Sequence, residues 1–265
     1  MARVRWVKSP EQLKREAERV PEPLESHVRS LRLVYETDPA VAAAVVPRPL
    51  VPAERPEVCV TFSQVAMQIT PEVRFEIGSA VFGVRASCDG TPGLWLLTMP
   101  ITAEQAVIGG RETYGEPKKL AAIELRVDEG RVSASVTRMG IPFLAAHGRL
   151  GAPLGPRALV EHAFCVKALP ACERSRGLDG EPLLVQLTWR HRHDRVLAVE
   201  DAALVLRESP FDPVADLPVR RLVRVEYEEG ASESDGRVLR ALPPEWVLPI
   251  LHGRYDEPGV QGIEV

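Results

Sequence analysis

Short segments with alternating apolar and polar residues recur along most of this 265-residue chain. A period of two is typical of β-strands that bury one face. Turn-forming residues separate the segments, as at residues 88–93 (CDGTPG) and 128–130 (DEG), and the chain contains 24 prolines. Few stretches have a convincing helical period. We therefore expect a mainly antiparallel, β-rich α+β fold with few short helices, organised as one domain over residues 1–265.

The expected strands follow one another at short intervals. They cover Arg32 to Tyr35, Val58 to Ile69, Val73 to Ala86, Gly93 to Met99, Ala122 to Val127, Arg131 to Thr137, Leu183 to His191, Val196 to Leu206 and Leu222 to Glu228. Residues 128–130 predict one hairpin, and residues 193–195 predict another. The segment Leu159 to Val166 fits either a strand or a helix, and we expect Gly140 to Ala158 to be rich in loops.

Helices and irregular structure are expected mainly towards the two ends. Residues 1–30 form an N-terminal helix and extension, with a charged amphipathic helix from Ser9 to Val20. A second short helix begins at Asp38 and ends before Pro47. Residues 229–265 are expected to form a C-terminal tail, and the acidic segment Glu228 to Asp235 is expected to be a mobile surface loop.

The segment 110–120, GRETYGEPKKL, contains two adjacent lysines, Lys118 and Lys119. Five of the 33 basic residues are lysines, which leaves 28 arginines, so lysine is not the usual surface cation of this chain. The simple alternative is an exposed basic corner after a turn. If the segment is extended, the two side chains point to opposite faces. Pro117 fixes φ directly before the pair and so restricts how the first lysine is aimed.

A lysine amine becomes a nucleophile only after it loses its proton, and its ordinary pKa of about 10.4 opposes that at neutral pH. Burial in an apolar pocket disfavours the charged form and lowers the pKa. The neutral amine can then condense with a ketone to an iminium, which accepts the electrons released when a neighbouring bond breaks. Because adjacent side chains of a strand diverge, desolvation explains such a shift better than contact between two ammonium groups.

The same segment resembles the signature of the acetoacetate decarboxylase family, which is Gly-Arg-Glu, a short spacer and Pro-Lys-Lys-Leu. The similarity continues in residues 33–38 (LVYETD), 45–50 (VVPRPL), 164–167 (FCVK) and 216–219 (DLPV), and covers roughly residues 31–225. The resemblance implies a β-barrel-like architecture. It also implies that Lys118 forms the Schiff base with Lys119 as its neighbour.

The resemblance also implies further site residues. Glu76 is the best match to a catalytic-site glutamate, and a second family glutamate falls near Ser63, where this chain has no acid. An arginine that positions the substrate carboxylate falls close to Arg29, one residue out of register. These departures weaken the case for decarboxylation and leave the iminium lysine intact. Tyr114 either lines the pocket and contacts the substrate or packs in the core.

One further contact is expected within the motif. Arg111 and Glu112 are expected to form an ion pair that fixes the turn before the lysines.

Composition excludes several classes of protein. The net charge is −4 and the positive charge is scattered, so we expect no nucleic-acid binding. The four cysteines form no CxxC pair and are expected to be buried, reduced thiols. The N-terminus lacks the apolar region of a secretory signal, and no apolar run is long enough to cross a membrane. We expect a cytoplasmic protein with no membrane partner.

Two other patterns have the spacing of a binding site. Gly110 and Gly115 have the spacing of a phosphate-binding loop, but Glu116 stands where its lysine should follow. His191 and His193 could share one face of a strand as metal ligands. A solvent-exposed charge cluster at the end of a hairpin is the simpler interpretation of these histidines.

The leading hypothesis is a Schiff-base lyase that acts on a small keto acid, by default decarboxylating an acetoacetate-like substrate. One alternative is a pyruvate-dependent aldolase-dehydratase that uses the same lysine. Another is a non-catalytic, ligand-binding member of the fold. No metal or organic cofactor is implied, and the resemblance implies a homo-oligomer.

Overall fold

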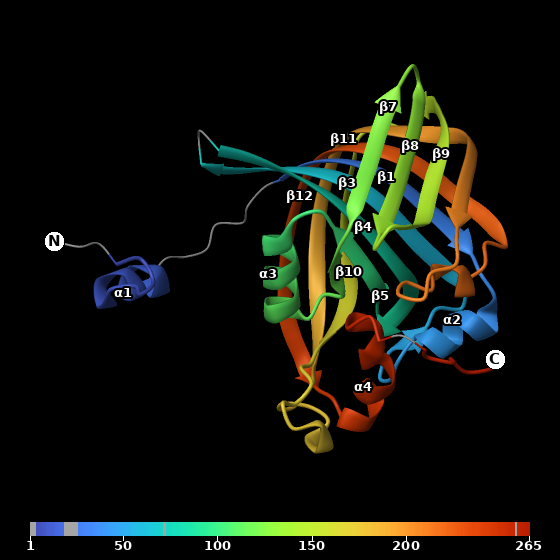
Figure 1. Ribbon diagram of the computed structural model, residues 1–265. Helices are drawn as coiled ribbons and strands as arrows, with labels where there is room; N and C mark the ends of the chain where they lie inside the picture. The colour runs from blue at the N-terminus through green and yellow to red at the C-terminus, as the bar shows by residue number, and fades with distance from the viewer. Residues whose placement is uncertain (1–3, 19–25, 71–72, 258) are drawn as a thin grey trace.

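The computed structural model describes residues 4–18, 26–70, 73–257 and 259–265 (Figure 1). Its strands are β1 (Ser26–Glu36), β2 (Val51–Pro52), β3 (Glu57–Thr70), β4 (Val73–Cys88), β5 (Thr91–Ile101), β6 (Lys118–Leu120), β7 (Ala122–Asp128), β8 (Arg131–Arg138), β9 (Ile141–Pro153), β10 (Arg157–Lys167), β11 (Leu183–Leu206) and β12 (Arg221–Ala241). Its helices are α1 (Pro10–Glu18), α2 (Pro39–Val45), α3 (Glu104–Tyr114) and α4 (Pro244–Leu251), with short 3-10 turns η1 (Arg174–Arg176), η2 (Val214–Asp216) and η3 (His252–Arg254). The β-rich fold with few short helices is therefore confirmed.

Seven strands form a ring in the order β10–β5–β4–β3–β1–β12–β11, and β11 pairs again with β10. Neighbours in the ring are antiparallel except β10 and β5, which pair in parallel at only Ala163↔Leu94 and Phe164↔Trp95. The ring is therefore barrel-like but unevenly closed. Strand β6 is added in parallel to β5.

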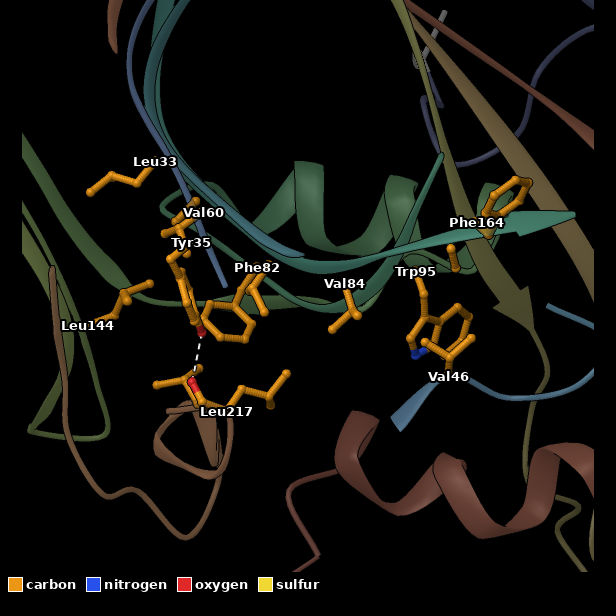
Figure 2. Packing of buried hydrophobic residues seen from close by; sticks show 14 of the residues in the cluster. Leu33, Tyr35, Val46, Val60, Phe82, Val84, Trp95, Leu144, Phe164 and Leu217 are labelled. Carbon is orange, nitrogen blue, oxygen red and sulfur yellow. Dashed lines mark hydrogen bonds between the residues drawn. The ribbon is translucent and has the colours of Figure 1, made fainter. Parts of the chain in front are cut away.

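Strands β9, β8 and β7 continue the sheet from β11 and lean across β1, β3 and β4 (Figure 1). The largest core fills the space between these two layers. Leu33 of β1 and Phe82 of β4 lie in one buried cluster with Leu144 of β9 (Figure 2). The Tyr35 hydroxyl donates a hydrogen bond of 2.9 Å to the backbone carbonyl of Leu217. The apolar face of the ring strands is thus the outer one.

The opposite face of the same strands lines the inside of the ring. In β1, Leu31 and Leu33 belong to the outer core, whereas Ser30 and Arg32 face inwards because successive side chains alternate. A smaller apolar cluster closes part of the interior: Val34, Cys59, Leu94, Leu96, Met99, Ala163, Cys165, Val185 and Leu187. The remaining interior is open to a ligand.

The structure corrects three expectations about secondary structure and adds helix α3, which carries the first half of the lysine motif. Residues 141–153 form strand β9 and not a loop. The hairpin expected at residues 193–195 is absent, because β11 runs unbroken from 183 to 206 with a bulge there. The acidic segment 228–235 is not a loop but part of β12, held between β1 and β11.

Several elements were predicted within a few residues of their observed bounds. They include α2, whose first turn is capped by the Asp38 side chain, and the hairpin of β7 and β8. Cys59, Cys88 and Cys165 are buried free thiols, and Cys172 is a free thiol on the surface. In the parts of the chain that the structure describes, none of the helices has the length and apolar character needed to cross a bilayer.

Candidate active site

The inside of the ring holds a cavity of about 590 Å³. Its walls come from strands β1, β3, β4, β5, β10, β11 and β12, and α3 and β6 add side chains at one side. A cavity of this size lies within the range of about 300–1,000 Å³ found for small-molecule sites. Lys118 is one of the residues that line it.

Local backbone geometry sets the position of Lys118. Helix α3 ends at Gly115, which has φ 75° and whose amide donates to the carbonyl of Arg111. A Cβ atom on Gly115 would come within 2.5 Å of the Cα of Lys167 and the carbonyl oxygen of Val166, so only glycine fits there. The chain then turns into β6, where Lys118 pairs with Met99 of β5.

Glu116 is the nearest ionic partner of this lysine. Its Oε2 lies 2.7 Å from Lys118 Nζ, and the side chains are 6% and 17% exposed. Residues two apart in an extended segment share a face, which brings both into the cavity. A Cβ atom on Gly110 would lie 2.2 Å from Glu116 Oε2 and 2.8 Å from Lys118 Nζ, so the glycine of the motif makes room for the pair.

Lys119 faces the other way, as its place in a strand predicts. Its Nζ lies 3.1 Å from Asp212 Oδ1 and 2.8 Å from Asp256 Oδ1, and it also donates to the carbonyl of Phe211 at 2.8 Å. Arg138 bridges the same two carboxylates at 2.6 and 2.5 Å. Two cations and two carboxylates thus form a buried cluster, which does not reach the amine of the neighbouring lysine.

The expected ion pair between Arg111 and Glu112 is not formed. Arg111 donates to the backbone carbonyls of Lys118 (3.2 Å) and Arg254 (2.9 Å) and stacks on the Tyr255 ring at 5.1 Å. Glu112 is exposed on the helix surface. The motif arginine therefore ties β6 to the C-terminal segment.

The structure brings together only some of the residues that the resemblance implied. Tyr114 lines the cavity beside Lys118 and also packs against the interior apolar cluster. Glu76 and Arg29 lie on the outer face of the ring wall, where both are exposed. Gln64 links them, because it accepts a hydrogen bond from Arg29 and donates one of 3.4 Å to Glu76.

Strand alternation explains why Glu76 and Arg29 lie outside the cavity. In β4, the inward neighbours of Glu76 are Ile77 and Ser79, and in β1 the inward residues are Val28, Ser30 and Arg32. A shift of one residue exchanges the two faces of a strand. Ser63, the position near which the second family glutamate was expected, lines the cavity. Its Oγ lies 2.8 Å from Ser30 Oγ.

Five ionisable residues, each buried or half-buried, line the cavity on four consecutive ring strands and were missed or misjudged by sequence reasoning. We call them the polar wall: Arg32 on β1, Glu161 on β10, His191 and His193 on β11, and Glu228 on β12. The histidines were expected in solvent, yet His193 is 5% exposed. Arg32 binds both oxygens of Glu161, with one bond of 2.6 Å. The available signal was the alternate spacing of the two histidines on one strand.

Burial controls the charge of these groups. It lowers the pKa of His191 to about 4, although Glu161 opposes the shift, and it also lowers the pKa of His193. Both imidazoles are therefore neutral at pH 7. Burial, with the charge of Glu116, raises the pKa of the Cys165 thiol, so this thiol stays protonated at neutral pH. No group of three metal-binding side chains occurs among the described residues.

Comparison with known sequences gives one consistent match. The family described as acetoacetate decarboxylase (ADC) matches residues 9–241. The acetoacetate decarboxylase of Acidiphilium cryptum (strain JF-5) is 30% identical over 208 residues, which cover 74% of this chain and 79% of that protein. That of Ralstonia nicotianae (strain ATCC BAA-1114 / GMI1000) is 28% identical over 212 residues, covering 74% and 78%.

Solved structures share the fold at lower identity. The acetoacetate decarboxylase of Legionella pneumophila superposes with a TM-score of 0.68 and 19% identity, covering 83% of this chain and 89% of that one. The enduracididine biosynthesis enzyme MppR, complexed with the condensation product of pyruvate and imidazole 4-carboxaldehyde, gives a TM-score of 0.70 at 15% identity, covering 83% and 90%.

Proposed function

This chain belongs to the acetoacetate decarboxylase family and is a carbon–carbon lyase, and from that membership we propose that Lys118 forms an iminium with a keto acid inside the ring. The observation that carries the proposal is the Lys118–Glu116 pair in the cavity, with Nζ and Oε2 2.7 Å apart. A lysine and a carboxylate at hydrogen-bond distance supply a nucleophile and the acid–base group that serves it.

Glu116 accepts the proton that Lys118 must lose before attack. The neutral amine adds to the ketone carbon, and the protonated carboxyl group of Glu116 returns the proton to the oxygen that leaves as water. The product is a protonated iminium on Nζ. Cleavage of the bond to the carboxylate then releases carbon dioxide, and the electron pair moves into the iminium to give an enamine. Protonation of the enamine carbon and hydrolysis release the ketone and restore the lysine.

The electrostatics of the cavity suit the loss of a carboxylate. Each lysine or arginine that lines the cavity in the described part of the chain already has a carboxylate partner: Lys118 with Glu116, Arg32 with Glu161 and Arg190 with Asp235. A substrate carboxylate is thus not held by an unpaired cation. Its conversion to neutral carbon dioxide removes a charge from acidic surroundings, and interactions of this kind favour the transition state over the ground state.

A second candidate is aldol or dehydratase chemistry on pyruvate through the same lysine. It is favoured by the placement of Glu116, because aldol chemistry needs a base that removes a proton beside the iminium, whereas decarboxylation makes the enamine without one. MppR shares the fold of this chain and is described as complexed with pyruvate.

Borohydride trapping distinguishes the decarboxylase hypothesis from the aldol or dehydratase hypothesis. The full chain is incubated separately with acetoacetate and with pyruvate, reduced, and analysed by intact mass and peptide mapping. We expect acetoacetate to leave a reduced acetone adduct on Lys118, and Lys118→Arg, which keeps the charge beside Glu116 but forms no stable imine, to leave none. Glu116→Gln should lower the rate of adduct formation by about 10²–10⁴-fold.

The outcomes separate the hypotheses. A pyruvate adduct together with an acetoacetate adduct that retains its carboxylate would select aldol or dehydratase chemistry. The absence of any adduct with either acid would reject lysine catalysis on small keto acids and favour the non-catalytic alternative.

A further inference from the structure

The polar wall holds more hydrogen-bonding capacity than the protein itself uses. Among the residues that the structure describes, three buried polar atoms of this wall have no hydrogen-bond partner: Arg32 Nε, His191 Nδ1 and His193 Nδ1. His193 Nδ1 lies 3.7 Å from Glu228 Oε1, and His191 Nε2 lies 3.8 Å from Glu161 Oε2, and both distances are too long for hydrogen bonds. Buried polar groups are nearly always paired in proteins, so a cluster of exceptions in one cavity indicates a ligand.

A bulge in β11 and a glycine opposite it in β12 set the geometry of the polar wall. His191 and His193 stack with their centroids 5.2 Å apart, directly before the bulge that follows His193 in β11. Opposite this bulge, a Cβ atom on Gly230 would lie 2.0 Å from the carbonyl oxygen of Arg192, so glycine permits the close approach of β12. Bulges beside active sites commonly re-aim a side chain.

The charge of the wall selects the kind of group that it can bind. The guanidinium of Arg32 is neutralised by Glu161, and Glu228 accepts a hydrogen bond from Arg157. A second substrate carboxylate would meet Glu161 and Glu228, and a substrate cation would meet Arg32. Each neutral imidazole offers one donor and one acceptor. A hydroxyl group, which donates and accepts, satisfies both requirements.

The cavity is also much larger than acetoacetate needs. Its volume of about 590 Å³ is of the order that encloses a drug-sized ligand. Lys118 on β6 and the polar wall on β1, β10, β11 and β12 line the same space. A keto acid as small as acetoacetate would fill only part of this space.

We propose that the polar wall binds a hydroxyl group at the far end of a keto acid longer than acetoacetate, with His191 and His193 as the residues that select it. This inference rests on the proposed function, because it takes the keto group to be attached to Lys118. The histidines thereby determine specificity, while the lysine and Glu116 carry out the chemistry.

The test uses the full chain and four β-keto acids: acetoacetate and three longer acids of equal length that end in a methyl, a hydroxyl or a carboxylate group. The concentration dependence of borohydride trapping on Lys118 gives an apparent affinity for each acid. We expect the hydroxyl acid to be favoured over the methyl acid by about 10²-fold or more, since a site built to bind a hydroxyl group rejects the analogue that lacks it.

Variants assign the preference to the wall. His193→Leu should bring the hydroxyl-to-methyl ratio close to one, and His191→Leu provides a second, less buried position should that variant fold poorly. Arg192→Gln is the matched control, because Arg192 lies between the two histidines on the exposed face of β11 and should keep the wild-type ratio.

The contrary outcomes are distinct. Equal trapping of the methyl and hydroxyl acids by the wild-type chain, a preference for the carboxylate acid, or an unchanged ratio in both histidine variants would overturn the assignment of the wall while leaving the lysine chemistry in place. The absence of any adduct from all four acids would overturn the proposed function, and this inference with it.

Discussion

Lys118 and Lys119 are the same residue type at successive positions of one short strand, yet they lie in different surroundings. Lys118 borders an open cavity and has one carboxylate partner, Glu116. Lys119 is buried against Asp212 and Asp256, with a backbone carbonyl as a third acceptor. A nucleophile such as Lys118 must be able to release its proton and move towards a substrate. A residue that holds the strand in place, as Lys119 does, must do neither.

Because their surroundings differ, Lys118 is suited to chemistry and its neighbour Lys119 to stability. A buried charge that keeps several partners is costly to disturb, while a charge beside a cavity can exchange its partner for a ligand. The strand alternation that sends the two side chains to opposite faces lets one motif supply both functions. The cluster around Lys119 fixes β6, and β6 then aims Lys118.

The largest expected effect is on chemistry at Lys118. We expect Lys118→Arg to lower turnover by about 10⁴-fold or more, as removal of a covalent nucleophile does. The arginine keeps a cation beside Glu116, so the free energy of unfolding should change by less than about 1 kcal/mol. Steady-state kinetics and urea denaturation measure the two effects. A large loss of stability would mean that the two lysines do not differ as described.

The next largest effect is on stability at Lys119. Lys119→Met should lower the free energy of unfolding by about 3–5 kcal/mol, because Asp212 would remain buried with fewer partners. Urea denaturation followed by circular dichroism measures it. Folded Lys119→Met that is as stable as the wild type but loses all turnover would instead make this lysine a catalytic residue.

Substitutions at two adjacent glycines test how much space the Lys118–Glu116 pair requires. Gly110→Ala would push against Glu116 and Lys118, whereas a Cβ atom on Gly109 would meet nothing within 4 Å. We expect the first change to slow imine formation by about 10²-fold, as a small misplacement of reacting groups does. Gly109→Ala is the matched control in the same helix. Equal trapping rates in the two variants would show that the Lys118–Glu116 pair tolerates displacement.

Acid should weaken the cluster around Lys119. Hydrogen bonds from Arg138 and Lys119 outweigh burial and lower the pKa of Asp256. A lowered pKa adds stability above the unfolded value of about 3.9, and this stability is lost as the pH falls through the folded pKa. Asp256→Asn should therefore have a shallower loss of stability below about pH 4 than the wild type. Parallel pH–stability curves would contradict this.

The smallest expected effect is on the outer face of the ring. Arg29→Gln and Glu76→Gln should leave turnover within about twofold and stability within about 0.5 kcal/mol, as for most surface changes. Kinetics with the same keto acid measure this. A loss of turnover near that of the Lys118 variant would return both residues to the catalytic site.

The sequence sufficed to predict the β-rich fold and, for an extended segment, the opposite directions of the two lysine side chains. It failed to predict which face of each ring strand lines the site. Apolar residues normally mark the interior of a barrel, but here Leu31 and Leu33 pack outwards against a second layer, and Ser30 and Arg32 face the cavity. A glutamate or arginine chosen by alignment one residue out of register then falls on the wrong face.

Two other segments that line the site were not predicted as strands, because they are rich in polar residues. Residues 228–235 resemble a loop, yet pairing with strands on both sides makes them a strand. The polar run around His193 suggested a hairpin, because a bulge inside a long strand leaves no clear pattern in the sequence. One domain over residues 1–265, homo-oligomerisation and cytoplasmic location stay predictions.

The contact between Arg111 and the carbonyl of Arg254 joins residues 143 positions apart. Asp256, close to that contact in sequence, is also the partner of Lys119. During synthesis the lysine motif leaves the ribosome well before the segment that fixes it. Because contacts between distant segments form late and fold slowly, the lysine motif of the nascent chain is incompletely anchored until residues 254–256 have emerged. Competence for chemistry should therefore be among the last properties that a newly made copy acquires.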